Sequence, residues 1–150
     1  MKLVKQLICV ALLIPIIFTM VHKPIMYKVN GSSMEPSLHD KQIILSINPV
    51  QIDKMDIVAI KLEDGLIIVK RVIAIPHDTV YIHDGQVYVN ERPVDDIKTD
   101  YAGLAAIPYT LGEGQYFVLG DNRSHSIDSR YPAVSLVSMD QILGKIIFVN

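Results

Sequence analysis

A serine in a polar turn is the first residue of this chain able to do covalent chemistry. The stretch "NGSSMEPSL" at residues 30–38 places Ser33 between Gly31 and Pro36. A serine hydroxyl is a weak nucleophile unless a neighbouring base takes its proton. Gly31 permits unusual backbone angles and the close approach of another chain. Such a turn is usually structural when taken alone, so the case for chemistry depends on a base elsewhere.

A candidate base lies further along the chain, in "LIIVKRVIAI" at residues 66–75. Both alternating faces of this run are apolar, so Lys70 or Arg71 is expected inside an apolar cleft or at its mouth. Burial removes hydration from a lysine, lowers its pKa and lets the neutral amine act as a general base. Arginine stays protonated and cannot do this. The alternative is that both side chains reach solvent at a strand edge.

A third stretch, "GDNRSHSIDSR" at residues 120–130, holds hydroxyl, carboxylate and guanidinium groups and a single apolar side chain. His125 lies within it, which raises a Ser-His-Asp triad as an alternative. Residues this close in sequence rarely converge on one hydroxyl, so we expect a lysine base instead. Three other histidines each precede an aspartate, a pattern that could suggest metal ligands. They occupy turn positions where aspartate caps the backbone, so we expect no metal site; they are His39, His77 and His83.

Short strands are the elements expected to position these residues. Seven segments are rich in Val, Ile, Tyr and Phe, several alternate with period two, and turn residues separate them. Asp84-Gly85 between two such runs predicts a hairpin. Residues 91–114 are turn-rich and suggest a loop or small flap, and residues 133–143 could hold one helical turn. The predicted strands are residues 42–47, 56–62, 66–75, 79–84, 86–90, 115–120 and 145–150.

Composition limits the functions open to the chain. Its 150 residues suit one domain with a small appendage. The net charge of −2 gives no basic surface for nucleic acid. Cys9 is the single cysteine, which excludes an internal disulfide and a cysteine-based zinc site.

The N-terminus predicts a membrane anchor. Lys2 and Lys5 precede an uncharged apolar run at residues 7–21. This run is slightly short for a span, and flanking lysines can extend it by snorkelling. A cleaved secretory signal is the first alternative, but no small-x-small cleavage site follows; a buried core helix is the second. The early lysines favour a cytoplasmic N-terminus, although lysines after the run weaken that bias.

Three motifs together resemble those of type I signal peptidases, membrane-bound serine endopeptidases with a Ser-Lys dyad. They are "GSSMEPSL", "KRVIAIPHD" and "GDNRSHSIDSR", in this order behind an N-terminal anchor. The resemblance covers nearly the whole chain. It implies a mainly β fold, an antiparallel sheet or partial barrel of the signal peptidase/LexA-like type, behind one transmembrane helix. We expect an anchor at 1–24 and an extracytoplasmic catalytic domain at 25–150, with a small cap around 79–114.

The resemblance also implies residue roles. Ser33 would be the nucleophile and its backbone N–H an oxyanion donor, Lys70 the general base, and Ser126 the residue that hydrogen-bonds and orients the lysine. Supporting residues would be Asp121, Asn122 and Arg123 in the loop and an Asp128–Arg130 ion pair. Apolar subsites that accept small residues at the first and third positions before the cut would be lined by Val29, Met34, Leu38, Ile68 and Val69.

The implied function is removal of signal peptides after Ala-x-Ala-like sites, on the outer side of the cytoplasmic membrane. The partners would be secretory preproteins and membrane lipid, with no cofactor, metal or nucleic acid. Gly31 departs from members with a hydroxyl residue there, which leaves the second oxyanion donor open. The alternatives are a catalytically inactive, membrane-tethered scaffold, a LexA-type self-cleaving repressor, and a peptidase dedicated to few substrates.

Overall fold

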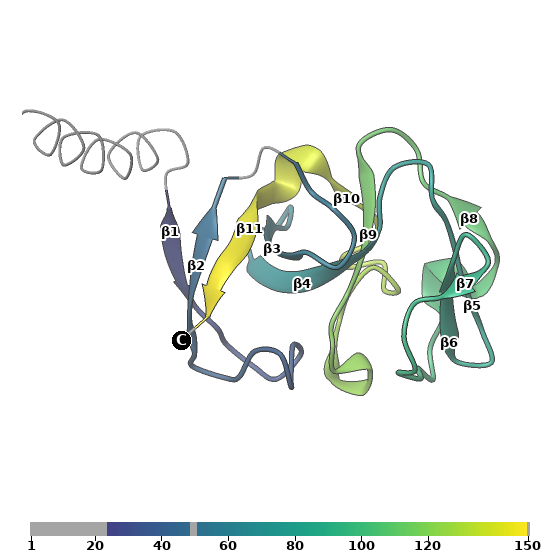
Figure 1. The fold of residues 1–150 in the computed structure, drawn as a ribbon, viewed down its shortest axis with the longest axis horizontal. Helices are drawn as coiled ribbons and strands as arrows, with labels where there is room; N and C mark the ends of the chain where they lie inside the picture. Colours follow the sequence, from purple (N-terminus) through teal and green to yellow (C-terminus); the bar gives the residue numbers. More distant parts are fainter. Residues whose placement is uncertain (1–23, 49–50, 150) are drawn as a thin grey trace, which may run out of the picture.

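Two antiparallel sheets make up the computed structural model, which describes residues 24–48 and 51–149. The larger sheet curls into a half-barrel, and the smaller sheet lies at the opposite end of the molecule from β1 (Figure 1). The larger sheet has the order β1 (Ile25–Lys28), β2 (Ile43–Ile47), β11 (Ile142–Val149), β3 (Ile57–Lys61), β4 (Ile67–Ala74), β9 (Gln115–Leu119) and β10 (Val137–Ser138). The smaller has the order β7 (Arg92–Pro93), β6 (Gln86–Val89), β5 (Thr79–His83) and β8 (Tyr109–Thr110).

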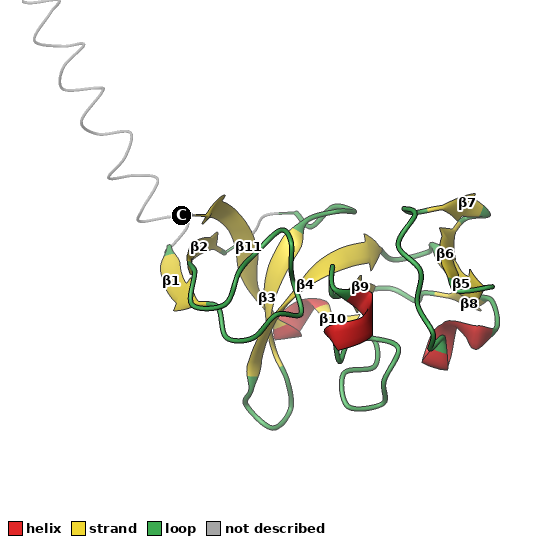
Figure 2. Cartoon of the chain, turned by 90° about the horizontal axis from the view of Figure 1, so that it is seen from below, coloured by secondary structure: helices red, strands yellow, loops and turns green. Residues whose placement is uncertain are grey.

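Helical structure in the described residues is confined to three short 3-10 turns, drawn in red in Figure 2. They are η1 (Gly103–Ala106), η2 (Arg123–His125) and η3 (Met139–Gln141). Among these residues no helix is long and apolar enough to cross a membrane. The anchor predicted at 1–24 lies, except for Pro24, outside the described residues.

The mainly β prediction is confirmed, and all seven predicted strands are present with ends shifted by a few residues. The predicted hairpin is also present: Asp84 and Gly85 have φ values of 48° and 74°, the left-handed values that a tight hairpin turn requires. Four short strands were not predicted, namely β1, β7, β8 and β10. The helical turn considered for 133–143 corresponds to η3.

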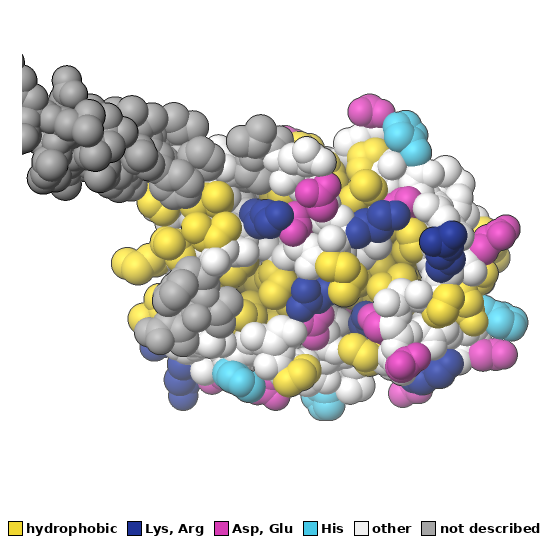
Figure 3. All heavy atoms as spheres, in the orientation of Figure 1, with side chains coloured by type: hydrophobic (Ala, Val, Ile, Leu, Met, Phe, Trp, Pro, Cys, Tyr) yellow, Lys and Arg dark blue, Asp and Glu magenta, His cyan; other side chains and the backbone are white. Residues whose placement is uncertain are grey.

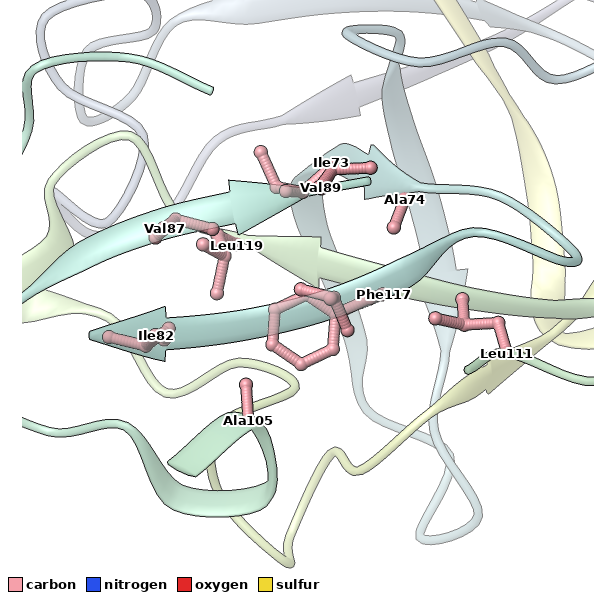
Figure 4. Close-up of a cluster of buried hydrophobic side chains, with 10 residues drawn as sticks. Ile73, Ala74, Ile82, Val87, Val89, Ala105, Leu111, Phe117 and Leu119 are labelled. Atoms are coloured by element: carbon pink, nitrogen blue, oxygen red, sulfur yellow. The ribbon is translucent and has the colours of Figure 1, made fainter. Parts of the chain in front are cut away.

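The two sheets share an apolar core. Phe117 and Leu119 of β9 pack with Ile73 of β4 and with Val80 and Val87 of the smaller sheet (Figure 4). Removing this apolar surface from water stabilises the contact between the sheets. A second cluster fills the half-barrel, and a third, at the β1–β2 end, consists of Val29, Met34, Leu38 and Ile44.

One half of β4 has a free edge. Residues Ile67–Arg71 pair with β3, but pairing with β9 starts only at Arg71, opposite Leu119. Within the described structure, residues 67–70 therefore pair on one side only. Such an edge can accept the backbone of another chain as an added strand.

Apolar side chains gather on the surface at the end of the molecule where β1 and β2 lie (Figure 3). Ile25, Met26, Ile43 and Ile147 are all exposed there, and Met26 is 73% exposed. A contiguous apolar surface of this kind is typical of a contact with a membrane or another protein.

Candidate active site

Ser33 and Lys70 meet at the end of the free half of β4. Ser33 lies in the turn that connects β1 to β2, where Gly31 has a φ of 96°. The Nζ of Lys70 lies 2.8 Å from the Oγ of Ser33 and 3.0 Å from the carbonyl oxygen of Val69. The lysine is only 4% exposed, whereas Ser33 is half-buried and lines the cleft, so a buried amine lies against a hydroxyl that a substrate can reach.

Burial decides the charge state that Lys70 prefers. Loss of hydration lowers the pKa of its ammonium group, and the carboxylates of Asp128 and Asp121 oppose this effect less strongly. A lysine with a lowered pKa exists more readily as a neutral amine, the form that can take a proton from a hydroxyl. Of the two cations considered from sequence, Lys70 is the buried one, whereas Arg71 is half-buried.

The loop at 120–130 is fastened directly to the nucleophile turn, and the two lie side by side in Figure 1. The backbone N–H of Asn122 donates to the Ser33 carbonyl oxygen at 3.0 Å. Its side-chain amide donates to the Ser32 carbonyl oxygen at 3.2 Å. These two bonds fix the peptide groups on both sides of Ser33.

A paired arginine and aspartate reinforce this junction. Arg71 donates through Nε and Nη2 to the two carboxylate oxygens of Asp121, at 2.7 and 2.6 Å. Its Nη1 also donates to the Met55 carbonyl oxygen at 2.8 Å. A bidentate pair fixes orientation as well as distance. The predicted supporting residue Asp121 thus acts with Arg71, for which sequence reasoning assigned no partner.

The Asp128–Arg130 ion pair lies fully inside the protein. Arg130 donates to Asp128 through Nε at 2.7 Å and Nη2 at 2.8 Å. Asp128 also accepts the Gly120 N–H at 3.0 Å, and Arg130 Nη2 donates to the Arg123 carbonyl oxygen at 2.8 Å. Because every charge has a partner, the pair holds both ends of the loop without an unsatisfied buried ion.

The hydrogen bond expected between Ser126 and Lys70 is not made. Ser126 Oγ is buried and has no hydrogen-bond partner in the part of the chain that the structure describes. The side chain instead packs against Gly120: a Cβ on that glycine would lie 2.5 Å from the Ser126 Cβ and 2.5 Å from the Ser33 carbonyl oxygen. Gly120 therefore permits the close approach of Ser126 to the nucleophile turn, a role not recognised from the sequence.

Arg123 links the loop to the smaller sheet. Its Nε donates to the Gly120 carbonyl oxygen at 3.0 Å, and its guanidinium forms an ion pair with Asp95. Arg130 also donates to Thr99 Oγ1. The predicted loop residue Arg123 thus contacts the segment after β7 as well as its own loop.

A cleft of about 440 Å³ opens beside Ser33 and Lys70. Four of the five predicted subsite residues line it: Val29, Met34, Ile68 and Val69. The fifth predicted residue, Leu38, is not among the residues that line this cleft, and its side chain is fully buried in the cluster beneath the turn. Met34 belongs to the same buried cluster and also lines the cleft. The cleft is also lined by residues not predicted, namely Tyr27, Lys28, Asn30, Leu66, Ile67 and Ile127.

The histidines do not contact the serine. The Nδ1 of His125 lies 2.9 Å from Ser124 Oγ and 3.3 Å from Asn122 Oδ1, and its side chain is exposed. Among the described residues the other histidines, His39, His77 and His83, are also exposed, and His83 ends β5. Within the described structure, the geometry favours lysine over histidine as the partner of Ser33.

A serine beside a buried lysine, at a cleft with a free strand edge, is an arrangement suited to hydrolysis of an extended peptide. The family model described as "Signal peptidase, peptidase S26" matches residues 1–150, so the chain belongs to this family of serine endopeptidases. Membership supports removal of signal peptides from secretory preproteins, and the family is membrane-associated.

Individual relatives agree with this assignment. The chain is 34% identical to signal peptidase I S of Bacillus subtilis (strain 168), with 82% of this chain and 74% of the relative covered. It is 32% identical to signal peptidase I of Bacillus licheniformis, with 97% and 86% covered. A crystal structure of a signal peptidase I from Enterococcus faecalis V583 is similar at a TM-score of 0.51 and 26% identity, covering 65% of this chain and 97% of that one.

Proposed function

We propose that this protein cleaves signal peptides from secretory preproteins with Ser33 as nucleophile and Lys70 as general base. The observation that carries the proposal is the 2.8 Å contact between the Nζ of the buried Lys70 and the Oγ of Ser33, at the cleft. The lowered pKa of Lys70 supports its role as a base.

The reaction needs only these two side chains and water. Neutral Lys70 takes the Ser33 proton while Oγ attacks the carbonyl carbon of the residue before the cut. Protonated Lys70 then gives that proton to the leaving amine, and the C–N bond breaks to leave an acyl-enzyme. Lys70 next takes a proton from water, the water oxygen attacks the acyl carbon, and Ser33 leaves with the proton. The Ser33 N–H stabilises the oxyanion, and the Ser126 hydroxyl, which has no partner in the described structure, accepts a hydrogen bond from the lysine during the reaction.

The substrate binds as an extended strand. The free edge at residues 67–70 supplies backbone groups, and Val29 and Met34 also line the cleft. Membership of the signal peptidase family supports a preference for small residues at the first and third positions before the cut, the Ala-x-Ala preference. No metal or nucleotide enters these steps.

The membrane holds the enzyme near its substrates. We propose a single-pass anchor at 1–24 and a catalytic domain at 25–150 on the extracytoplasmic side of the cytoplasmic membrane, with a cap around 79–114. The exposed apolar side chains of Ile25, Met26 and Ile43, directly after the anchor, support this placement.

Cleavage of a preprotein with an Ala-x-Ala site, in lipid or detergent, tests the proposal. The full-length protein should cut after the second alanine, and Ser33→Ala and Lys70→Ala should each lose at least about a thousandfold in rate. A folded wild type that leaves every preprotein intact would favour the inactive scaffold instead. An active Lys70→Ala would place the base elsewhere.

A further inference from the structure

Ile127 is the one residue of the 120–130 loop that lines the cleft, within the described structure. It is 63% exposed, whereas its neighbours Ser126 and Asp128 are buried. A single exposed isoleucine is ordinary on a protein surface. Ile127, however, lines the same cleft as Ser33 and Lys70, where a bound substrate would contact it.

The loop holds Ile127 in place from both sides. The Ser126 carbonyl oxygen accepts a hydrogen bond from Arg130 at 3.3 Å, and Asp128 accepts the Gly120 N–H at 3.0 Å. Ser129 donates from its backbone to the Val118 carbonyl oxygen at 3.1 Å. Because these buried neighbours are hydrogen-bonded, the backbone at Ile127 has little freedom to move. The side chain of Ile127 therefore stays at the wall of the cleft.

The order of the strands indicates that Ile127 lies past the Ser33–Lys70 pair in the direction in which β4 runs from residue 67 to Arg71. The free edge of β4 runs over residues 67–70, and Val69 and Ile68 line the cleft along it. From Arg71 onward this edge of β4 pairs with β9, starting at Leu119. Leu119 is the last residue of β9, and the 120–130 loop follows it directly. A peptide that lies along the free edge with its reacting carbonyl at Ser33 therefore meets Ile127 with the residues that follow the cut.

We propose that Ile127 is a specificity-determining residue that forms an apolar wall for the first substrate residue after the scissile bond. This inference rests on the proposed function. The wall favours an apolar residue there over a charged one, because a carboxylate against Ile127 would lose hydration without gaining a partner. The contact exists only until the amine leaves, so it affects formation of the acyl-enzyme and not its hydrolysis.

Two peptides that differ only in the residue after the cut, leucine or aspartate, test this inference. With the full-length enzyme in detergent, kcat/KM for the leucine peptide should exceed that for the aspartate peptide. Ile127→Ala should reduce that ratio by about fivefold, less than the tenfold or more of an enclosed apolar pocket, because the wall is partly open. Ile127→Val should keep most of the ratio, and the deacylation rate should be equal for both peptides in every variant.

Ile107→Ala is the matched control, because Ile107 is 72% exposed and lies outside the cleft. It should leave the ratio unchanged, and thermal unfolding should show that all variants are folded. An active wild type whose ratio survives Ile127→Ala would overturn the inference and leave the proposed function standing. A change confined to selectivity before the cut would also overturn it. An inert wild type would instead contradict the proposed function.

Discussion

The charge state of Lys70 results from a competition in which burial prevails. Asp128 and Asp121 would stabilise an ammonium group, yet each is already paired with an arginine, Arg130 and Arg71. Their remaining attraction for Lys70 is smaller than the hydration that the lysine loses on burial. The two arginines thus make a neutral lysine possible next to two carboxylates.

Ser126 should separate activity from stability. Its hydroxyl is buried without a partner, and such a group costs about 1–3 kcal/mol of folding free energy. Ser126→Ala should therefore keep or raise the melting temperature, while kcat falls about tenfold or more because Lys70 can no longer form the hydrogen bond to this hydroxyl that we propose for the reaction. Thermal unfolding and kcat measured on the same sample check this. Parallel losses in both would mean that the hydroxyl is structural.

Sequence reasoning singled out Ser33 and Lys70 because residue type, apolar surroundings and motif resemblance all agreed. It assigned no partner to Arg71 because Asp121 lies far away in the chain, and the choice between solvent and ion pair depends on folding. It placed both Met34 and Leu38 at the cleft, and both are buried in one cluster, but only Met34 also lines the cleft. The expected Ser126–Lys70 bond came from resemblance alone, and this structure does not contain it.

At the scale of elements, two loops and one strand edge make the site. The turn at 29–42 carries Ser33, β4 carries Lys70, and the 120–130 loop fastens the turn through Asn122. Each has a rigid base in the larger sheet, so the reacting groups lie on loops positioned by a scaffold.

Gly120 lies at the closest contact between the 120–130 loop and the turn that carries Ser33. Gly120→Ala should cost about 1–3 kcal/mol in unfolding free energy, because the added methyl overlaps Ser126 and the Ser33 carbonyl. The displaced turn should lower kcat about a hundredfold. Gly112→Ala is the control, since its Cβ meets only the flexible end of Gln115. Denaturant unfolding and cleavage rates of both variants test this prediction. If Gly120→Ala keeps full activity, the close contact at Gly120 does not position Ser33.

Strand positions were predictable and their order was not. Alternation and turn residues located β2 to β6, but β11, near the end of the chain, lies between β2 and β3. Such pairing depends on contacts distant in sequence. β1 escaped prediction because its residues Ile25–Lys28 are mostly exposed at a sheet edge and show no buried alternation.

At the scale of the whole molecule, the smaller sheet supports the catalytic loop. The sheets share the core around Phe117, and two buried arginines, Arg123 and Arg130, reach from the loop to Asp95 and Thr99. Asp95 and Thr99 lie in the segment that follows β7, so this segment and the smaller sheet stabilise the loop, although none of their residues lines the cleft.

Removal of the Asp95 carboxylate should expose this dependence. The Arg123 side chain is 2% exposed, so Asp95→Ala leaves a buried cation short of its counterion. We expect a loss of about 2–3 kcal/mol in unfolding free energy, below the full cost of a broken buried pair because Asp95 is partly exposed. The rate should fall as well. Asp96→Ala, at an exposed neighbour, should change neither. Equal unfolding curves for Asp95→Ala and Asp96→Ala would show that the Arg123–Asp95 ion pair does not stabilise the loop.

The pH dependence of acyl-enzyme formation tests the central claim most directly. The neutral form of Lys70 is the active one, so the rate should rise with pH and level off once the lysine is deprotonated. Because burial lowers the pKa of Lys70, the midpoint should fall below the ordinary lysine value of about 10.4. Lys70→Arg, which cannot deprotonate, should be inert throughout. A rate that stays flat from acid to strongly alkaline pH would contradict a lysine base.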